Sequence, residues 1–363
     1  MTNIRRSIIA SALLGIATAA AGDIVTELGL RSADEPVRNM AGWSPAGPIV
    51  VRVDSPERLA WLQETAGDAV LIGVYDEAEA LVAMPQATAL LGYCSRELVT
   101  AAPDLHWIQV FTAGAERCVD ALTETNRDLL LTNMQRVTSA QIAEHVMGML
   151  LGFTRGLAPH IRQQSSGRWN PDLVPRAARP GLNGKTMLLV GLGGIGTAVA
   201  QRAHGFDMRI TAVRASGRPG PDYIAEVAKP DQLLRLAAEA DVIVNSVPIT
   251  DATTGLFNAE FFATMKPTAY FLNVGRGRSV ITADLIAALQ AGELAGAGLD
   301  VVDPEPLPAD HPLWQMPNVI ITPHISAGSG QSLDRIFLVL RENLQRYVDG
   351  EPMLSVVNVE RGY

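Results

Sequence analysis

Cysteine is almost absent from this sequence. Two cysteines, Cys94 and Cys118, occur in 363 residues, which is too few for a disulfide framework, and they are not spaced as a Cys-x-x-Cys metal clip. Because a cysteine outside such patterns usually packs as a small hydrophobic side chain, we expect both to be small buried hydrophobic residues and not reactive thiols. No HExxH sequence and no other Cys and His ligand spacing occurs. The sequence therefore predicts no bound metal.

Positive charge is scarce as well. The formal net charge is -9 and no basic tract is present. Binding to nucleic acid depends largely on cationic contacts with phosphates, so this balance argues against a nucleic-acid partner.

Long apolar runs are limited to the N-terminus. Arg5 and Arg6 precede an uncharged stretch over 8–21 that is shorter than the about 20 apolar residues of a membrane span. Basic residues, an apolar stretch and small residues together are typical of a signal peptide, and paired arginines suggest a twin-arginine signal. We expect residues 1–22 to direct export to the periplasm, with no stable span in the mature chain. Translation starting near Met40 would instead give a cytoplasmic protein.

The rest of the chain is rich enough in hydrophobic residues, at 48%, to bury a large core, and its length suggests two domains. A polar segment over 23–47 is typical of a linker. Short apolar runs then alternate with helical patterns over 48–140, and a helix within 328–363 completes this domain. The second domain, 141–327, shows the same alternation and includes most of a long helix expected over 139–164. The pattern predicts two α/β domains with Rossmann-like, doubly wound parallel sheets and a ligand cleft between them.

The most informative motif is a glycine-rich loop in the second domain. The apolar run KTMLLV leads into Gly191-x-Gly193-x-x-Gly196, with Gly194 and Ile195 inside the loop, and a helical pattern follows. In a dinucleotide fingerprint the first glycine allows the turn, the second admits the pyrophosphate and the third lets the helix pack against the strand. The flanking strand and helix make this context specific. We expect a bound dinucleotide.

The end of the next apolar run indicates which dinucleotide. An acidic residue that binds the ribose 2′-hydroxyl is expected roughly 20 residues beyond the glycines. Arg214 stands there instead, followed by Ser216 and Arg218. Guanidinium and hydroxyl groups suit a 2′-phosphate that a carboxylate would repel, so NADP(H) is favoured. If these arginines are ordinary solvated loop residues, NAD(H) remains open.

Three polar residues follow apolar runs further along the second domain: Arg276, Glu305 and His324. Open α/β sheets place ligand-binding residues at such strand ends. A guanidinium can hold a substrate carboxylate, and an imidazolium supported by a carboxylate can protonate a carbonyl oxygen as hydride arrives. This set suits the reduction of a 2-oxo acid.

With these motifs in the same order and approximate spacing, the chain resembles the D-isomer-specific 2-hydroxyacid dehydrogenases. The shared sequences are GLGGIG, NSVPITDATTGLFN, NVGRG, GLDVVDPEPLP and TPHISAG. The resemblance implies that Arg276 binds substrate, that His324 is the acid/base and that Glu305 is its partner. It also implies a homodimer formed through the region of the helix that follows residue 139. Further implied contacts are with the cofactor, at Pro248, Thr253, Val274 and Asp300, and with the substrate carboxylate, at the backbone of Ala113 and Gly114.

Several functions remain open within this resemblance. Glu305 argues against the formate dehydrogenases, which have Gln there, whereas phosphite and phosphoglycerate dehydrogenases stay possible. The compact length and the Arg214 pattern favour a glyoxylate or hydroxypyruvate reductase that forms the D-2-hydroxy acid. A non-catalytic protein that senses dinucleotides is the alternative from another class. His145, His204 and His311 are expected to have no chemical role.

Overall fold

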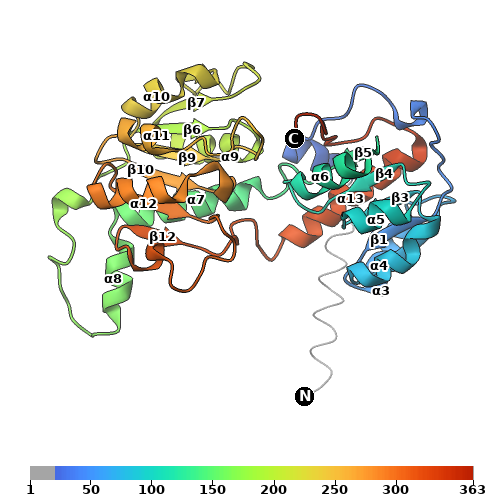
Figure 1. Ribbon diagram of the computed structural model, residues 1–363, viewed down its shortest axis with the longest axis horizontal. Helices are drawn as coiled ribbons and strands as arrows, with labels where there is room; N and C mark the ends of the chain where they lie inside the picture. The colour runs from blue at the N-terminus through green and yellow to red at the C-terminus, as the bar shows by residue number, and fades with distance from the viewer. Residues whose placement is uncertain (1–20, 363) are drawn as a thin grey trace. The chain divides into compact units, whose positions relative to one another are not determined.

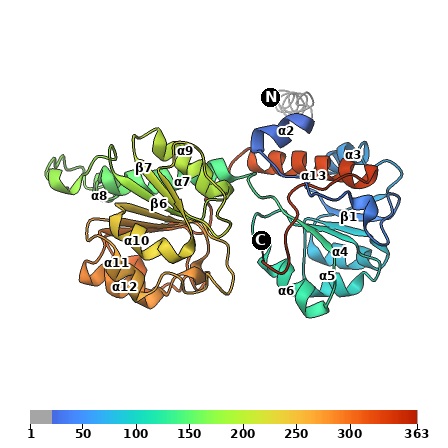
Figure 2. The ribbon, with the colours of Figure 1, turned by 90° about the horizontal axis from the view of Figure 1, so that it is seen from above.

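The computed structural model describes residues 21–362, so most of the signal peptide expected over 1–22 lies outside the described residues. The chain divides into two compact units. Unit 1 contains the residues up to 137 together with 330–363, and unit 2 contains 138–329. Each unit has its own parallel sheet with helices on both faces (Figures 1 and 2). The two doubly wound α/β sheets predicted from the sequence are thereby confirmed.

Unit 1 is built on a five-stranded sheet in the order β2-β1-β3-β4-β5. Helices α3 and α13 bury apolar side chains against one face, and α4, α5 and α6 cover the other (Figure 2). The strands are β1 Ile49–Arg52, β2 Leu71–Val74, β3 Ala89–Leu91, β4 Trp107–Gln109 and β5 Leu130–Thr132. The helices are α3 Pro56–Gln63, α4 Glu77–Ala83, α5 Arg96–Ala101, α6 Glu116–Thr125 and α13 Ser332–Asp349.

Unit 2 contains a seven-stranded sheet in the order β12-β11-β10-β9-β6-β7-β8. Helices α7 and α9 pack on one face, and α10, α11 and α12 pack on the other. Its strands are β6 Thr186–Val190, β7 Arg209–Val213, β8 Glu226–Ala228, β9 Val242–Asn245, β10 Tyr270–Asn273, β11 Gly296–Leu299 and β12 Val319–Ile321. Its helices are α7 Ser139–Thr154, α8 Leu157–Gln164, α9 Gly194–His204, α10 Leu233–Glu239, α11 Ala259–Thr264 and α12 Thr282–Ala291. The strand order reverses between β6 and β9, which is where open α/β sheets bind ligands.

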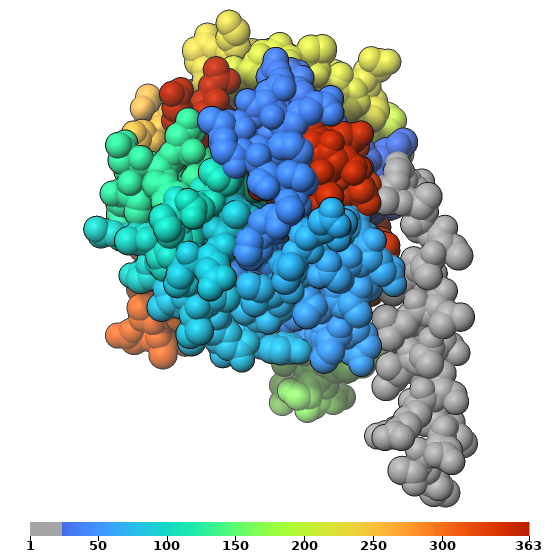
Figure 3. Space-filling model, turned by 90° about the vertical axis from the view of Figure 1, so that its right-hand side faces the viewer, coloured from blue at the N-terminus to red at the C-terminus, as the bar shows by residue number. Residues whose placement is uncertain are grey.

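The segment 23–47 is not the linker that its composition predicts. It begins within α2, Ala21–Leu28, and Ile24 and Val37 are buried in the same cluster as residues of α13. Figure 3 shows this N-terminal segment, in blue, beside the red C-terminal part of the chain. The polar composition misled the prediction because only a few apolar residues anchor the segment. Unit 1 therefore begins before Ile49.

The long helix expected over 139–164 is two helices. Helix α7 ends at Thr154, and Gly156 adopts a left-handed conformation with φ of +66° before α8 begins at Leu157. A glycine adopts this conformation without the strain that a Cβ atom would cause. Within the described residues no helix is both long and apolar enough to cross a membrane.

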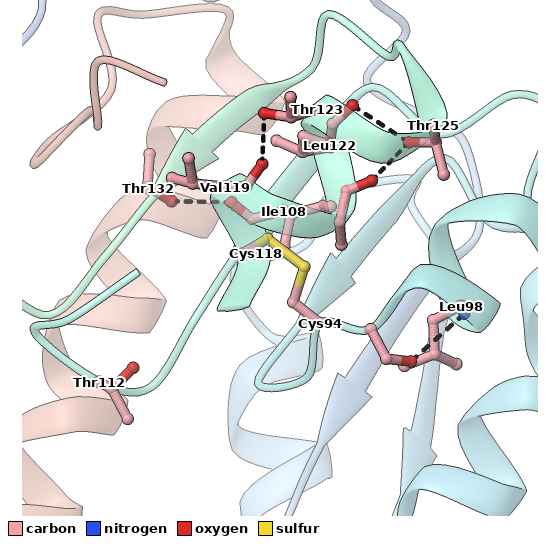
Figure 4. The surroundings of a disulfide bond; sticks show 12 residues. Cys94, Leu98, Ile108, Thr112, Cys118, Val119, Leu122, Thr123, Thr125 and Thr132 are labelled. Atoms are coloured by element: carbon pink, nitrogen blue, oxygen red, sulfur yellow. Dashed lines mark hydrogen bonds between the residues drawn. A yellow bond between two sulfur atoms is a disulfide. The ribbon is translucent and has the colours of Figure 1, made fainter. Parts of the chain in front are cut away.

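The prediction that both cysteines are simply small buried hydrophobic residues is wrong. Cys94 and Cys118 form a disulfide with their Cα atoms 5.4 Å apart (Figure 4). Cys94 lies in the loop after β3, and Cys118 lies in the first turn of α6, which follows β4. Since β3 and β4 are neighbours in the sheet, the fold brings together two residues that are 24 positions apart in the sequence. One cysteine pair is no framework, but it can still staple two segments.

Candidate active site

The glycine-rich loop joins β6 to α9 at the point where the strand order reverses. Gly191 has φ of +98°, and a Cβ atom there would lie 2.9 Å from the backbone oxygen of Ser246, the residue after β9. A Cβ atom on Gly196 would collide with the Gly191 oxygen, whereas Gly193 has no atom within 4 Å of its Cβ position. The loop therefore needs two glycines for packing and leaves open space over the third. That space suits a pyrophosphate at the N-terminus of α9.

The residues that follow β7 lie beside this loop. The Gly191 amide donates to the Val213 carbonyl at 2.9 Å, so Arg214 comes next to the glycines. Nη1 of Arg214 donates to the carbonyls of Arg218 and Pro219, both at 3.3 Å, and Nε of Arg218 donates to Ser216 Oγ at 3.3 Å. The structure thus gathers all three predicted side chains in one exposed turn. Two cations and a hydroxyl there form a suitable partner for a phosphate.

His324 and Glu305 form a hydrogen-bonded pair. Nδ1 of His324 is 2.9 Å from Oε2 of Glu305, whose Oε1 accepts a hydrogen bond from the Val302 amide at 3.0 Å. The His324 amide donates to the Asp300 carbonyl at 2.8 Å, and the residue has φ of +54°. The imidazole is therefore oriented through Nδ1, while Nε2 has no partner among residues 21–362 and is open to a substrate. Both side chains are partly exposed, as groups that meet a small molecule must be.

Arg276 lies in the turn after β10, the strand next to β11. Its carbonyl accepts hydrogen bonds from Ser279 Oγ at 2.6 Å and Asn273 Nδ2 at 3.2 Å, and its Nη1 donates to the Gly275 carbonyl at 2.7 Å. The next residue, Gly277, lies directly against the Val302 carbonyl. Since β10, β11 and β12 are neighbours, the three residues predicted to carry the chemistry follow adjacent strands at one edge of the sheet. The half-buried guanidinium suits a carboxylate ligand.

Asp300 fixes the segment that carries His324. Its side chain is 2% exposed and accepts hydrogen bonds from Thr322 Oγ1 at 2.7 Å, the Ile325 amide at 3.0 Å and the Ser326 amide at 3.2 Å. Burial by itself would raise the pKa of Asp300, but these hydrogen bonds outweigh it and hold the pKa below its ordinary value. The Asp300 carboxylate thereby stays ionised and holds the residues before and after His324 in the chain. Asp300 acts on the site through this segment.

The predicted substrate loop of unit 1 has a defined backbone orientation. The Thr112 carbonyl accepts from the Met134 amide at 3.0 Å, and the Ala113 carbonyl accepts from Asn133 Nδ2 at 2.7 Å. In a trans peptide the carbonyl and the next amide point in opposite directions. The amides of Ala113 and Gly114 are therefore turned away from the segment that holds the loop, and they have no acceptor in the described part of the chain. Such amides suit a carboxylate.

Comparisons with known proteins identify the family. Residues 147–326 match the model of the D-isomer specific 2-hydroxyacid dehydrogenase, NAD binding domain. The chain is also similar to a glyoxylate reductase of Thermofilum pendens, with 34% identity over 265 residues, 73% of this chain and 78% of that protein. The chain belongs to the D-isomer-specific 2-hydroxyacid dehydrogenases. It is thus an NAD(P)-dependent oxidoreductase of that family.

Further relatives agree with this assignment. Glyoxylate/hydroxypyruvate reductase B of Escherichia coli is 36% identical over 282 residues, 75% of this dehydrogenase and 85% of the relative. A structure of NADPH-dependent glyoxylate/hydroxypyruvate reductase from Sinorhizobium meliloti, in complex with NADP and sulfate, is 25% identical with a TM-score of 0.75. The match covers 87% of this chain and 100% of that one. Both units of the dehydrogenase are therefore included in the structural likeness.

The remaining predicted cofactor residues of the dehydrogenase follow β9 and β10. Thr253 Oγ1 donates to the Pro248 carbonyl at 2.7 Å and accepts from the Thr250 amide at 2.8 Å, which folds the loop after β9 on itself. Val274 is 5% exposed and directly follows β10. Both positions follow the carboxyl ends of their strands, on the same side of the sheet as the glycine loop and Arg276. They can line a dinucleotide.

Over residues 21–362 no group of His, Cys, Asp and Glu side chains is arranged to hold a metal ion.

His145, which is expected to have no chemical role, is hydrogen bonded within this network of the dehydrogenase. Its Nε2 lies 2.8 Å from Thr322 Oγ1 and 3.7 Å from Asp300 Oδ1. Residues 145 and 322 are 177 positions apart, so no local pattern could have linked them. The only signal in the sequence was that both lie in segments shared with the family. His145 is a positioning residue that holds Thr322 and, through it, Asp300.

Proposed function

We propose that this dehydrogenase reduces glyoxylate or hydroxypyruvate to the D-2-hydroxy acid with NADPH. The observation that carries the proposal is the His324–Glu305 pair at 2.9 Å. This pair lies at the carboxyl ends of the strands, as do Arg276 and the glycine loop. The names of the relatives from Thermofilum pendens, Escherichia coli and Sinorhizobium meliloti support the substrate class.

In this proposal each side chain has a separate task. The guanidinium of Arg276 binds the substrate carboxylate and polarises the neighbouring carbonyl group. His324 donates the proton on Nε2 to the carbonyl oxygen, and the Glu305 carboxylate at Nδ1 orients the ring and stabilises its positive charge. The bound nicotinamide supplies hydride. The amides of Ala113 and Gly114 supply further donors for the carboxylate.

The preference for NADPH is part of the proposal and rests on the Arg214 turn. A charge-assisted hydrogen bond to a phosphate contributes enough that its loss should change the preference about 10- to 100-fold. Arg214→Ala should lower kcat/KM with NADPH by that factor and leave the value with NADH nearly unchanged. Arg209→Ala is the matched control, because Arg209 is exposed at the opposite end of the same strand. Equal loss with both cofactors would contradict a role in recognising the 2′-phosphate.

We further propose that the protein is a homodimer. Helix α8 and the segment after it extend from the body of unit 2 in both ribbon views (Figures 1 and 2). They expose large apolar side chains, with Leu157, Ile161 and Trp169 47%, 67% and 97% exposed. Monomeric proteins rarely leave such a group uncovered, and a second copy would bury it.

Export to the periplasm is the remaining proposal. The basic and apolar pattern of residues 1–22 supports it, and so does the Cys94–Cys118 disulfide, because such bonds persist in oxidising compartments. The burial of Ile24 and Val37 argues against a start at Met40, which would delete part of the unit 1 core. N-terminal sequencing of the protein from a periplasmic fraction should show cleavage near Ala21. Recovery only in the cytosol, with Met40 first, would contradict export.

A further inference from the structure

The Cys94–Cys118 disulfide is located next to the substrate loop of unit 1. That loop begins at Phe111, just beyond β4, and leads into α6 at Glu116. Cys118 is the third residue of α6, four positions after Gly114. Figure 4 shows the bond joining α6 to the loop after β3, with Thr112 on the chain that leads to α6. The disulfide thus adjoins the amides proposed to bind the substrate carboxylate.

Both ends of the substrate loop are tied to the segment after β3. At the start, the Gly92 amide donates to the carbonyl of Gln109, the last residue of β4, at 2.7 Å. A Cβ atom on Gly92 would also lie 3.2 Å from the Phe111 ring. At the far end, the tie is the covalent bond between Cys94 and Cys118. The segment 92–94 is therefore bonded to the chain before the loop, at Gln109, and after it, at Cys118.

Helix α6 is anchored differently at its two ends. Behind its C-terminus, Arg127 donates to the carbonyls of Ala102, Pro103 and Leu105 at 3.2, 3.1 and 3.1 Å. At its N-terminus the capping position is Ala115, whose side chain cannot accept a hydrogen bond from the first turn. The first turn therefore lacks a side-chain cap, and the disulfide joins the helix at this turn.

We infer that the Cys94–Cys118 disulfide positions the substrate loop, so that the oxidised protein binds its oxo acid more tightly than the reduced protein. The inference rests on the proposed function, because it assumes that the amides of Ala113 and Gly114 bind the substrate carboxylate. Cys94 and Cys118 are positioning residues that act through α6 and do not take part in the reaction. Cys94 is partly exposed, whereas Cys118 is buried, so a reductant would approach the bond from the side of Cys94.

Reduction with dithiothreitol tests the inference on the full-length, folded enzyme. The S–S bond takes up two electrons and two protons to give two thiols, and dithiothreitol closes to its own cyclic disulfide. Alkylation with iodoacetamide then keeps the thiols apart. The KM for glyoxylate or hydroxypyruvate should rise about tenfold, the effect of one misplaced hydrogen bond, with kcat within about twofold. The NADPH dissociation constant, measured by fluorescence, should not change, because its predicted site is in unit 2.

Variants separate positioning from general stability. The double variant Cys94→Ser/Cys118→Ser should show the raised KM with and without dithiothreitol. Leu62→Ala is the matched control, because Leu62 is fully buried on the opposite face of the same sheet and its loss destabilises unit 1 without touching α6. It should lower the melting temperature and leave KM unchanged.

The outcomes distinguish this inference from the proposed function. An unchanged KM after reduction would overturn the inference, as would an equal rise of KM in Leu62→Ala, or two free thiols in the native protein. If the oxidised enzyme turns over no oxo acid, the proposed function fails instead. Hydrogen exchange of residues 111–119 then decides the structural part, because their amides should exchange about tenfold faster after reduction if the disulfide holds the loop. Unchanged exchange would contradict it.

Discussion

Glu305 shows how a single side chain can define the role of its neighbour. One of its oxygens accepts a hydrogen bond from the Val302 amide and the other faces His324 Nδ1, so it fixes the ring and leaves Nε2 for the substrate in the proposed reaction. The arrangement matches a general acid supported by a carboxylate. Without the Glu305 carboxylate, the His324 ring would lose its hydrogen-bond partner at Nδ1.

Glu305→Gln should therefore lower kcat about 100-fold while NADPH still binds with its original affinity. Steady-state kinetics together with cofactor fluorescence measure the two effects. Asp303→Asn is the matched control, because Asp303 is an exposed acid two residues away. If both variants lose the same activity, the pairing has no specific role and local charge alone matters.

Asn133 is a residue that the sequence did not single out. Its Nδ2 donates to the Ala113 carbonyl at 2.7 Å, and its Oδ1 accepts from the Gln135 amide at 3.1 Å. These bonds turn the substrate-loop amides outward. Asn133→Ala should raise the KM for the oxo acid about tenfold and change kcat little. Asn258→Ala, which removes the N-cap of α11, loses a comparable hydrogen bond in unit 2 and should leave that KM unchanged. The reverse pattern would show that the loop does not depend on Asn133.

Among single residues, the sequence predicted where the candidate catalytic residues lie but not which side chains hold them in place. Arg276, Glu305 and His324 each follow an apolar run, so their positions at strand ends could be inferred. His145, Thr322 and Asn133 act through contacts that depend on the fold. No local periodicity encodes a contact between residues that lie far apart in the chain.

At the scale of elements, the C-terminal helix α13 supports unit 1. Tyr347 is 1% exposed, and its ring stacks on Trp107 of β4 with the centroids 4.7 Å apart. Burial raises the pKa of Tyr347 from 10.0 to about 12. Between about pH 10 and 12 the phenol is therefore mainly neutral in the folded state and mainly ionised in the unfolded chain.

This pKa shift predicts that the folded protein loses stability at alkaline pH. Because the folded pKa is the higher one, its contribution to stability is complete below about pH 10 and is lost as the pH rises through about 12. The free energy of unfolding should fall by about 2 kcal/mol over that window from this group. In Tyr347→Phe that part of the fall should disappear, which denaturant titrations at each pH can measure. An unchanged pH profile in the variant would contradict the assignment.

Elements were predicted well where an apolar run was long and poorly where a few residues decided the structure. The central strands of both sheets follow the apolar runs. Helix α2 was missed because its segment is mostly polar, and the disulfide was missed because β3 and β4 had to be neighbours before Cys94 and Cys118 could meet. The break at Gly156 depends on one positive φ inside an otherwise helical pattern.

For the whole molecule, the exposed apolar side chains of α8 and of the segment after it predict the oligomeric state. The mass in solution, measured by light scattering, should be twice that of one chain. Ile161→Ser/Trp169→Ser should shift the protein towards the monomer, because it removes apolar surface that a second copy would bury. Val82→Ser is the matched control, since Val82 is 84% exposed on unit 1. A monomeric wild-type protein would contradict the dimer.

The proposed reaction is tested by measuring the oxidation of NADPH and NADH by purified wild-type protein and by His324→Gln, with glyoxylate and with hydroxypyruvate. The wild type should turn over the oxo acids with a preference for NADPH. His324→Gln should lose at least about 100-fold in kcat and still bind NADPH. Wild-type protein that binds NADPH but reduces neither oxo acid, or a His324→Gln variant as active as the wild type, would contradict it.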